Sequence, residues 1–296
     1  MSTLLRWLTW VGQGIGIGVA NVIPGVSGGT MALIFGIYER LISLLSDVVR
    51  SGLKLLRFDL SGFWTDIRSL DLPFLFWLAV GVVLAPLLGA AVIPGALETW
   101  PEESRSLFFG LILGTLPIPW LRIRKHDARN VIVLLVAAAI SFLLVGIPPL
   151  DPGQPGLVAV FFSAALAICA MILPGVSGAF ILLILGMYAP IFEAIDARDP
   201  AVVGVFILGA GIGLGSFAVF LKWLLERAHD LTMAALVGLM AGSLRSLWPW
   251  LAEDRSLLLP DGSDAIGWIV LLGLGGLAVS AFMTWLEVRR KSGGEA

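Results

Sequence analysis

The chain has 296 residues, of which 58% are hydrophobic and 14% charged, and its formal net charge at pH 7 is −2. Its mean hydropathy of +0.97 is typical of a polytopic membrane protein and excludes a soluble globular domain. The single cysteine, Cys169, excludes an intrachain disulfide and a cysteine-based metal site.

Ten apolar segments are expected to enter or cross the membrane. Several are shorter than the ~20 residues that a spanning helix needs, so some are candidates for the half-helices of re-entrant hairpins. The first has no small-residue cleavage site, and we expect it to be retained. The stretch 50–72 alternates apolar and charged residues, which predicts an amphipathic helix on the membrane surface. The predicted segments are 7–22, 31–49, 74–93, 106–120, 131–147, 157–173, 179–195, 202–225, 231–248 and 265–285.

A Pro-Gly-Val-Ser-Gly motif occurs twice, at 24–28 and at 174–178, with an offset of 150 residues. Proline removes a backbone donor and glycine frees the backbone, so each copy should break a helix at membrane depth. Such breaks in matching halves of a chain are typical of a transporter's binding site. Other residues that match at this offset are Ala20, Gly36 and Tyr38, which correspond to Ala170, Gly186 and Tyr188.

A second internal similarity relates 110–116 to 238–244, and each stretch is followed by a tryptophan. The halves 1–150 and 151–296 then hold five segments each, and an odd number gives them opposite topology. We therefore predict one all-α membrane domain, built as an inverted repeat of two five-segment halves. Each half contains a helix pair broken at its Pro-Gly-Val-Ser-Gly motif. The pair either spans the membrane or, as we favour, is re-entrant.

The distribution of positive charge predicts the orientation. Fifteen Lys and Arg residues fall on the side of the membrane that carries the N-terminus. The other side receives Arg105, Arg198 and Arg255, with Arg245 near that end of its helix. The positive-inside rule therefore places the N- and C-termini in the cytoplasm. The first motif should enter from the cytoplasmic side and the second from outside, with their tips close to each other.

The motif residues are candidates for an anion site. A helix that begins inside a membrane leaves backbone N–H groups unpaired and carries a partial positive charge, which suits phosphate. Ser27 and Ser177 stand where N-cap residues would, and the glycines allow a ligand to approach the backbone. The alternative is that the serines only cap helices and the glycines only pack. The candidate substrate-binding residues are Gly25, Ser27, Gly28, Gly29, Thr30, Gly175, Ser177 and Gly178.

Two charged residues extend this hypothesis. Arg245 is expected near the outer headgroup level, where a guanidinium can hold phosphate through two hydrogen bonds. The alternative is that it extends to the interface beside two tryptophans. Glu39 is a candidate proton carrier, and the alternative is a salt bridge to Arg40 or Arg50. The two histidines have no other ligand at metal-binding spacing, so we expect no metal and no cofactor.

The chain resembles the PopT-type polyprenyl-phosphate transporters, a bacterial family. The resemblance rests on the doubled motif, on Gly36-Ile37-Tyr38-Glu39 after its first copy and on the stretch 244–250. The resemblance covers nearly the whole chain, although Asn21 stands where many members are expected to have aspartate. It implies that undecaprenyl phosphate is returned from the outer to the inner leaflet of the bacterial cytoplasmic membrane for reuse. The implied partners are this lipid and membrane lipids, without nucleic acid, and homo-oligomerisation is left open.

Two other functions are weighed against this one. A transporter or channel for a small anion would use the same helix ends. An intramembrane serine hydrolase is suggested by the Gly-x-Ser-Gly within each motif, but nucleophilic serine needs a base within hydrogen-bond reach. Neither histidine lies inside an apolar helix. We therefore expect a protein that is not an enzyme.

Overall fold

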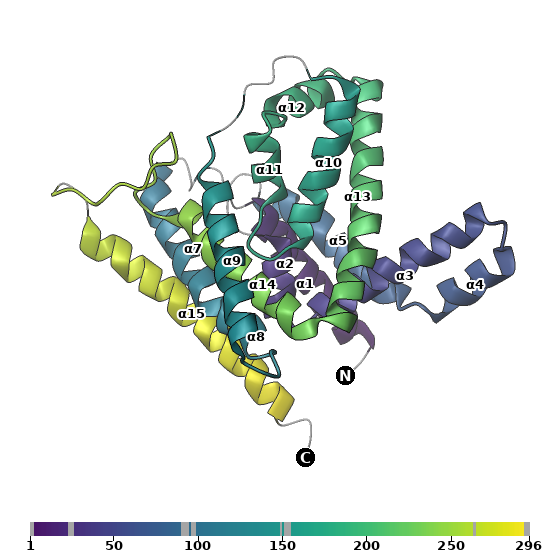
Figure 1. Ribbon diagram of the computed structural model, residues 1–296, viewed down its shortest axis with the longest axis horizontal. Helices are drawn as coiled ribbons and strands as arrows, with labels where there is room; N and C mark the ends of the chain where they lie inside the picture. Colours follow the sequence, from purple (N-terminus) through teal and green to yellow (C-terminus); the bar gives the residue numbers. More distant parts are fainter. Residues whose placement is uncertain are drawn as a thin grey trace.

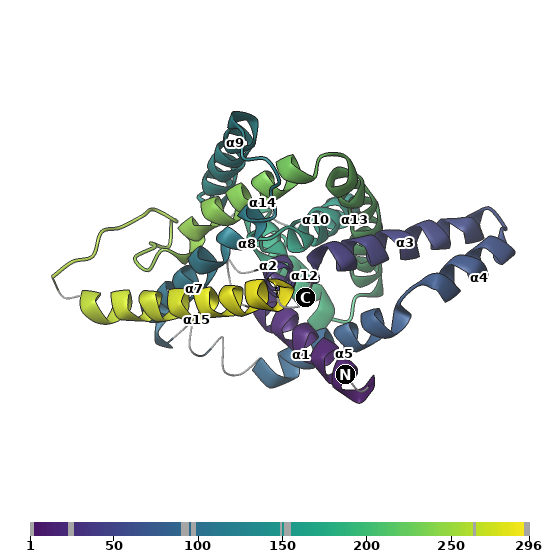
Figure 2. The same cartoon turned by 90° about the horizontal axis from the view of Figure 1, so that it is seen from below.

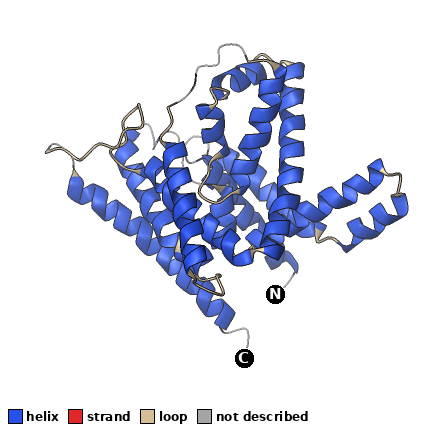
Figure 3. Ribbon diagram, viewed as in Figure 1, coloured by secondary structure: helices blue, strands red, loops and turns tan. Residues whose placement is uncertain are grey.

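The computed structural model describes residues 3–22, 27–89, 95, 99–148, 150, 155–262 and 265–292. The regular elements of these ranges are all helices, apart from an isolated bridge between Leu251 and Leu257 (Figure 3). The prediction of an all-α fold is confirmed. The division into two inverted halves stays a prediction, and Gly25 lies outside the described residues.

The helices before residue 150 form a first series and those after it a second (Figure 1). The first series contains α1 (Thr3–Val22), α2 (Gly28–Ile34), α3 (Tyr38–Leu56), α4 (Leu60–Ser69), α5 (Leu72–Gly89), α7 (Pro101–Thr115), α8 (Pro117–Trp120) and α9 (Ala128–Val145). The second contains α10 (Leu157–Ile172), α11 (Gly178–Ile184), α12 (Tyr188–Asp196), α13 (Pro200–Arg227), α14 (His229–Ser243), the 3-10 helix η1 (Leu244–Leu247) and α15 (Ile266–Ser292).

The helices that follow the two motifs, α2 and α11, are each seven residues long and end in the same turn. Gly36 and Gly186 adopt φ values of +69° and +67°, a left-handed conformation that glycine reaches without steric cost. The next residue then donates its N–H to a carbonyl five residues back, at 3.0 Å in the first copy and 2.8 Å in the second. The expected runs 31–49 and 179–195 are therefore each divided into two helices, and α11 meets α12 at 104°.

Equivalent helices of the two series pack in equivalent ways. α1 lies along α5 as α10 lies along α13, and α7 lies along α15 as α14 lies along α9. Glycines allow the close approach: a Cβ on Gly110 of α7 would lie 1.8 Å from the Gly273 carbonyl oxygen. A Cβ on Gly238 of α14 would lie 2.2 Å from the Leu134 carbonyl oxygen. Small residues at helix crossings are typical of membrane proteins, and these two glycines belong to the second internal similarity.

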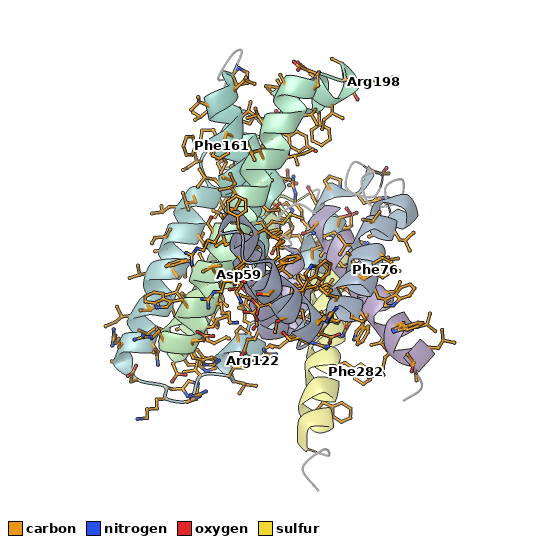
Figure 4. The ribbon with its side chains drawn as sticks, turned by 90° about the vertical axis from the view of Figure 1, so that its right-hand side faces the viewer. Asp59, Phe76, Arg122, Phe161, Arg198 and Phe282 are labelled. Carbon is orange, nitrogen blue, oxygen red and sulfur yellow. The ribbon has the colours of Figure 1, made fainter. Side chains whose placement is uncertain are left out.

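The outside of the helix bundle is apolar. By length and composition α9 and α13 can each cross a membrane, and the bent pairs α4–α5 and α11–α12 can add two spans among the described residues. Phe76 and Phe282 are exposed on the outer faces of α5 and α15 (Figure 4). Such contiguous apolar surface is what lipid covers in a membrane protein.

The stretch 50–72 forms part of a helical hairpin and not an isolated surface helix. α3 and α4 run side by side and project from the bundle (Figure 2). Lys54 of α3 pairs with Asp66 of α4 at 2.6 Å, and no residue of α4 is buried. The base of the hairpin is anchored where Asp47 pairs with Lys222 of α13 at 2.7 Å. Contact of α4 with the membrane surface stays a prediction.

Candidate substrate-binding site

The second motif copy lies directly against the start of α2. The Ser27 hydroxyl donates to the Leu173 carbonyl oxygen at 2.8 Å, and the Gly175 N–H donates to the Thr30 hydroxyl at 2.9 Å. Both side chains are buried. Gly175 has a φ of +81°, and a Cβ on Gly29 would lie 2.3 Å from the Ile172 carbonyl oxygen. The two copies therefore contact each other inside the helix bundle.

The helix start in the first copy is closed by protein groups. The Gly28 N–H donates to the Asn21 side-chain oxygen at 2.8 Å. The Gly29 N–H donates to the Ser27 hydroxyl at 3.1 Å, and the Thr30 N–H to the Ser27 carbonyl oxygen at 3.0 Å. In this conformation the first N–H groups of α2 are therefore used within the protein. An aspartate in place of Asn21 would put a negative charge on the same N–H, whereas asparagine makes the bond without the charge.

The bond between Thr30 and Gly175 gives a first prediction. Thr30→Val keeps the side-chain shape but leaves the Gly175 N–H buried without its acceptor, which should cost about 1–3 kcal/mol. Thr30→Ser keeps the hydroxyl and should remain closer to wild type. Thermal unfolding of the detergent-solubilised protein measures both. Equal unfolding temperatures for the two variants would contradict a role for this hydrogen bond.

A cavity of about 420 Å³ opens beside the second copy. This volume lies within the range of natural ligand sites, about 300–1,000 Å³. Its walls come from α1, α7, α11 with its N-cap, the start of α12, η1 and the segment after η1. The lining residues used below are Asn21, Arg105, Ser177, Phe180, Leu183, Tyr188, Glu253 and Arg255.

The described positions of the first copy that correspond to this lining are closed. At the offset of 150 residues, the lining residues Ser177, Phe180, Leu183 and Tyr188 correspond to Ser27, Thr30, Leu33 and Tyr38. Each of the four counterparts in the first half is at most 1% exposed. The two motif regions are therefore related in sequence but not in accessibility: the second faces a cavity and the first is packed shut.

Arg105 brings a positive charge to the cavity from the first turns of α7. Its Nη1 donates to the carbonyl oxygens of Leu251 at 3.0 Å and Pro249 at 3.4 Å. These bonds attach α7 to the segment between η1 and α15. The negative charge of Glu102, three residues earlier in α7, acts favourably on this guanidinium.

Arg255 brings a second charge from a tight turn. Its backbone has a φ of +66°, uncommon for a residue with a side chain, and its guanidinium lies 4.3 Å from the centre of the Phe180 ring. The Asp254 carboxylate supports the turn by accepting from the N–H and hydroxyl of Ser256 at 2.9 and 2.7 Å. These bonds hold the pKa of Asp254 below its ordinary value. The support is therefore complete above the ordinary aspartate pKa and is lost only as the pH falls through the lowered value.

Arg245, the predicted phosphate clamp, is not among the residues that line the cavity. Its Nη1 donates to the Phe142 carbonyl oxygen at the end of α9, and its Nη2 donates to the Arg255 carbonyl oxygen, both at 3.1 Å. The guanidinium also lies 4.6 Å from the centre of the Phe142 ring. Arg245 thus stands behind Arg255, and direct contact with a phosphate stays a prediction.

Glu39, the predicted proton carrier, is at the start of α3 and outside the cavity lining. Its carboxylate lies 3.4 Å from Nη1 of Arg122 and 3.7 Å from Nε2 of His229. Arg40, one of its expected partners, pairs with Asp71 instead.

Figure 4 shows Arg122 and Arg198 at opposite ends of the molecule. Among the described residues, no group of three His, Cys, Asp or Glu side chains could hold a metal ion.

The chain is similar to known proteins over most of its length. A family model described as VCA0040-like, undecaprenyl phosphate translocase-like, matches residues 17–263. A polyprenyl-phosphate transporter of Vibrio cholerae is 39% identical over 249 residues, which cover 83% of this chain and 79% of that protein. A polyprenyl-phosphate transporter of Staphylococcus aureus is 28% identical over 291 residues, covering 91% and 96% of the two chains. No solved structure gives a significant match.

Proposed function

Because the chain belongs to the undecaprenyl phosphate translocase-like family, we propose that it carries undecaprenyl phosphate from the outer to the inner leaflet of the bacterial cytoplasmic membrane. The lipid carrier would then be available for another round of envelope synthesis. One observation carries the proposal: the two motif copies contact each other inside an all-helical bundle, beside a cavity whose walls include the two arginines Arg105 and Arg255. That arrangement suits an anionic headgroup.

The physical task of such a protein is to carry a charge across hydrocarbon. Burying an unpaired ion in an apolar medium is costly, so the phosphate headgroup makes unassisted flipping slow. The prenyl tail needs no such shelter, because it is as apolar as the lipid around it. A cavity that encloses only the headgroup, within helices whose outer faces are apolar, is therefore sufficient.

The difference in accessibility between the motif copies supports alternating access. We assign the cavity beside Ser177 and Gly178 to the side from which the second copy enters, which the charge distribution predicts to be the outer side. In the opposite state Ser27, Gly28, Gly29 and Thr30 would line the equivalent cavity, and their helix N–H groups would face the phosphate. The four closed counterparts listed above are the residues that this change would expose.

This mechanism predicts unequal labelling of equivalent positions. In a Cys169→Ser background, Leu183→Cys should react with a membrane-impermeant thiol reagent added outside the cell, and Leu33→Cys should not. Leu183 lines the cavity, whereas Leu33 is 1% exposed. Reaction of both positions from the same side would contradict the proposed states.

The hydroxyl groups of both motif serines form hydrogen bonds with the backbone. The Ser27 hydroxyl donates to the Leu173 carbonyl oxygen, and the Ser177 hydroxyl accepts from the Phe180 N–H at 3.4 Å. Within the described chain, neither hydroxyl has a hydrogen bond to a histidine, lysine or carboxylate. A serine nucleophile needs such a base.

Proteoliposomes with undecaprenyl phosphate in both leaflets test the function. A phosphatase added outside removes phosphate only from headgroups that it can reach. Without protein the inner-leaflet lipid should stay protected, and with protein it should become accessible. Uptake of inorganic phosphate by the same vesicles is the control for a small-anion transporter. Phosphate uptake without lipid exposure would overturn the proposed substrate.

Glu39 retains its proposed role as a proton carrier, with a test of its own. A proton taken up with the lipid would reduce the negative charge moved against an interior-negative potential, worth about 2.3 kcal/mol per charge per 100 mV. Lipid exposure by the wild type should therefore respond to an imposed pH gradient, and Glu39→Gln should not. An identical response of both proteins would leave Glu39 only the partner of Arg122.

A further inference from the structure

Three arginines lie near one another beside the cavity. Arg105 and Arg255 line it, and Arg245 stands behind Arg255. A guanidinium has five N–H donors, yet within the described chain the hydrogen bonds of Arg105 and Arg255 use only Nη1 of each. Their acceptors are backbone carbonyl oxygens, so these contacts orient the groups without neutralising them. Donors are therefore left for a ligand, and the three arginines outnumber the two nearby carboxylates, Glu102 and Glu253.

The arrangement is unfavourable in the absence of an anion. Like charges in a partly buried cluster repel one another, and burial adds a desolvation cost. Arg255 also occupies a backbone conformation that side chains rarely adopt. Strained residues of this kind are typical of ligand sites, where the surrounding structure fixes them. Here Asp254 supports the turn from one side and Arg245 binds the Arg255 carbonyl oxygen.

We propose that Arg105 and Arg255 bind the phosphate group of a phosphate monoester in this cavity, and that Arg245 is a positioning residue for Arg255. This inference rests on the proposed function and names the headgroup site within it. The two guanidinium groups come from different parts of the fold, α7 and the segment after η1. Bound phosphate would therefore link elements that are far apart in sequence.

The rest of the lining favours a monoester over a free anion. Phe180, Leu183 and Tyr188 form a less polar wall, which suits the first carbon atoms of an alkyl chain. Glu253, the acidic residue of the lining, is exposed, so solvent screens its charge. Phosphate oxygens match two guanidinium groups through paired charge-assisted hydrogen bonds.

Isothermal titration of the full-length detergent-solubilised protein with farnesyl phosphate, farnesol and inorganic phosphate tests the inference. Arg105→Gln and Arg255→Asn remove the charges, and asparagine tolerates the left-handed backbone of residue 255. Arg198→Asn is the matched control, because Arg198 also has a positive φ, +54°, but is exposed and outside the cavity lining. Each cavity variant should bind farnesyl phosphate about tenfold to a hundredfold more weakly, and the control should bind as wild type does.

The outcomes separate this inference from the proposed function. Binding of farnesyl phosphate by the wild type, without binding of farnesol, supports recognition of the phosphate. If Arg105→Gln and Arg255→Asn then bind as wild type, the arginine site is overturned while the function stands. If the wild type does not bind farnesyl phosphate, the proposed function itself fails. Equal affinity for inorganic phosphate would keep the arginine site but overturn a monoester as its ligand.

Discussion

Gly29→Ala should abolish lipid exposure in proteoliposomes and sharply lower the unfolding temperature, whereas Gly52→Ala should do neither. A Cβ on Gly29 would lie 2.3 Å from the Ile172 carbonyl oxygen and 3.1 Å from the Pro174 backbone nitrogen. Both obstacles are backbone atoms, one at the end of α10 and one in the other motif copy, so no side chain can move to relieve the contact. Overpacking of this kind costs about 1–3 kcal/mol or more.

Gly52 supplies the control because a Cβ there would meet nothing within 4 Å. It lies inside α3, where replacing glycine by alanine should stabilise the helix by about 0.5–1 kcal/mol. The two variants thus make the same chemical change with opposite expected effects. Wild-type stability and lipid exposure in Gly29→Ala would show that the motif copies need not touch.

The doubled motif was the most informative part of the sequence. The odd number of segments in each half and the charge distribution together predict entry of the two copies from opposite sides, and hence contact between their tips. The offset of the doubled motif related Gly36 to Gly186, and the structure gives both the same left-handed turn. The resemblance to polyprenyl-phosphate transporters was confirmed by the family match. The same short sequence favours the same backbone turn, so an internal repeat in the sequence predicts that the turn will recur in the structure.

The cavity arginines could not be predicted in the same way. Arg105 stands in the first turns of an apolar helix, and Arg255 lies in a polar segment 150 residues later. Nothing local marks either as a ligand-binding residue, because their proximity arises only when α7 packs beside η1. The charge count held a partial signal, since it placed Arg105, Arg245 and Arg255 on one side of the membrane. Three of the four cations assigned to that side do meet in the fold.

The contacts of Arg245 show what the sequence could not supply. The sequence indicated a guanidinium near a predicted phosphate site, but not which acceptors it would find. The end of α9 offers carbonyl oxygens without helical partners, and such groups attract cations. Arg245 takes the Phe142 carbonyl oxygen there and reaches Arg255 with its other terminal nitrogen.

A double-mutant cycle separates positioning from direct contact. If Arg245 acts through Arg255, Arg245→Ala should weaken farnesyl phosphate binding about tenfold, or about 1.4 kcal/mol, and should add nothing in the Arg255→Asn background. Arg105 is held by a different segment, so the losses from Arg245→Ala and Arg105→Gln should add. Arg245→Lys keeps the charge but cannot span both carbonyl oxygens, so it should fall between Ala and wild type.

Gly146→Ala tests the same arrangement without removing any charge. A Cβ on Gly146 would lie 2.2 Å from both Cζ and Nη1 of Arg245, so the flexible guanidinium must move off the Phe142 carbonyl oxygen. Positioning predicts weaker farnesyl phosphate binding in this variant, with the unfolding temperature close to that of wild type because only a side-chain end is displaced.

The double-mutant cycle has an opposite outcome. If the losses from Arg245→Ala and Arg255→Asn add, Arg245 contacts the phosphate itself. Its bond to Arg255 would then only hold the turn.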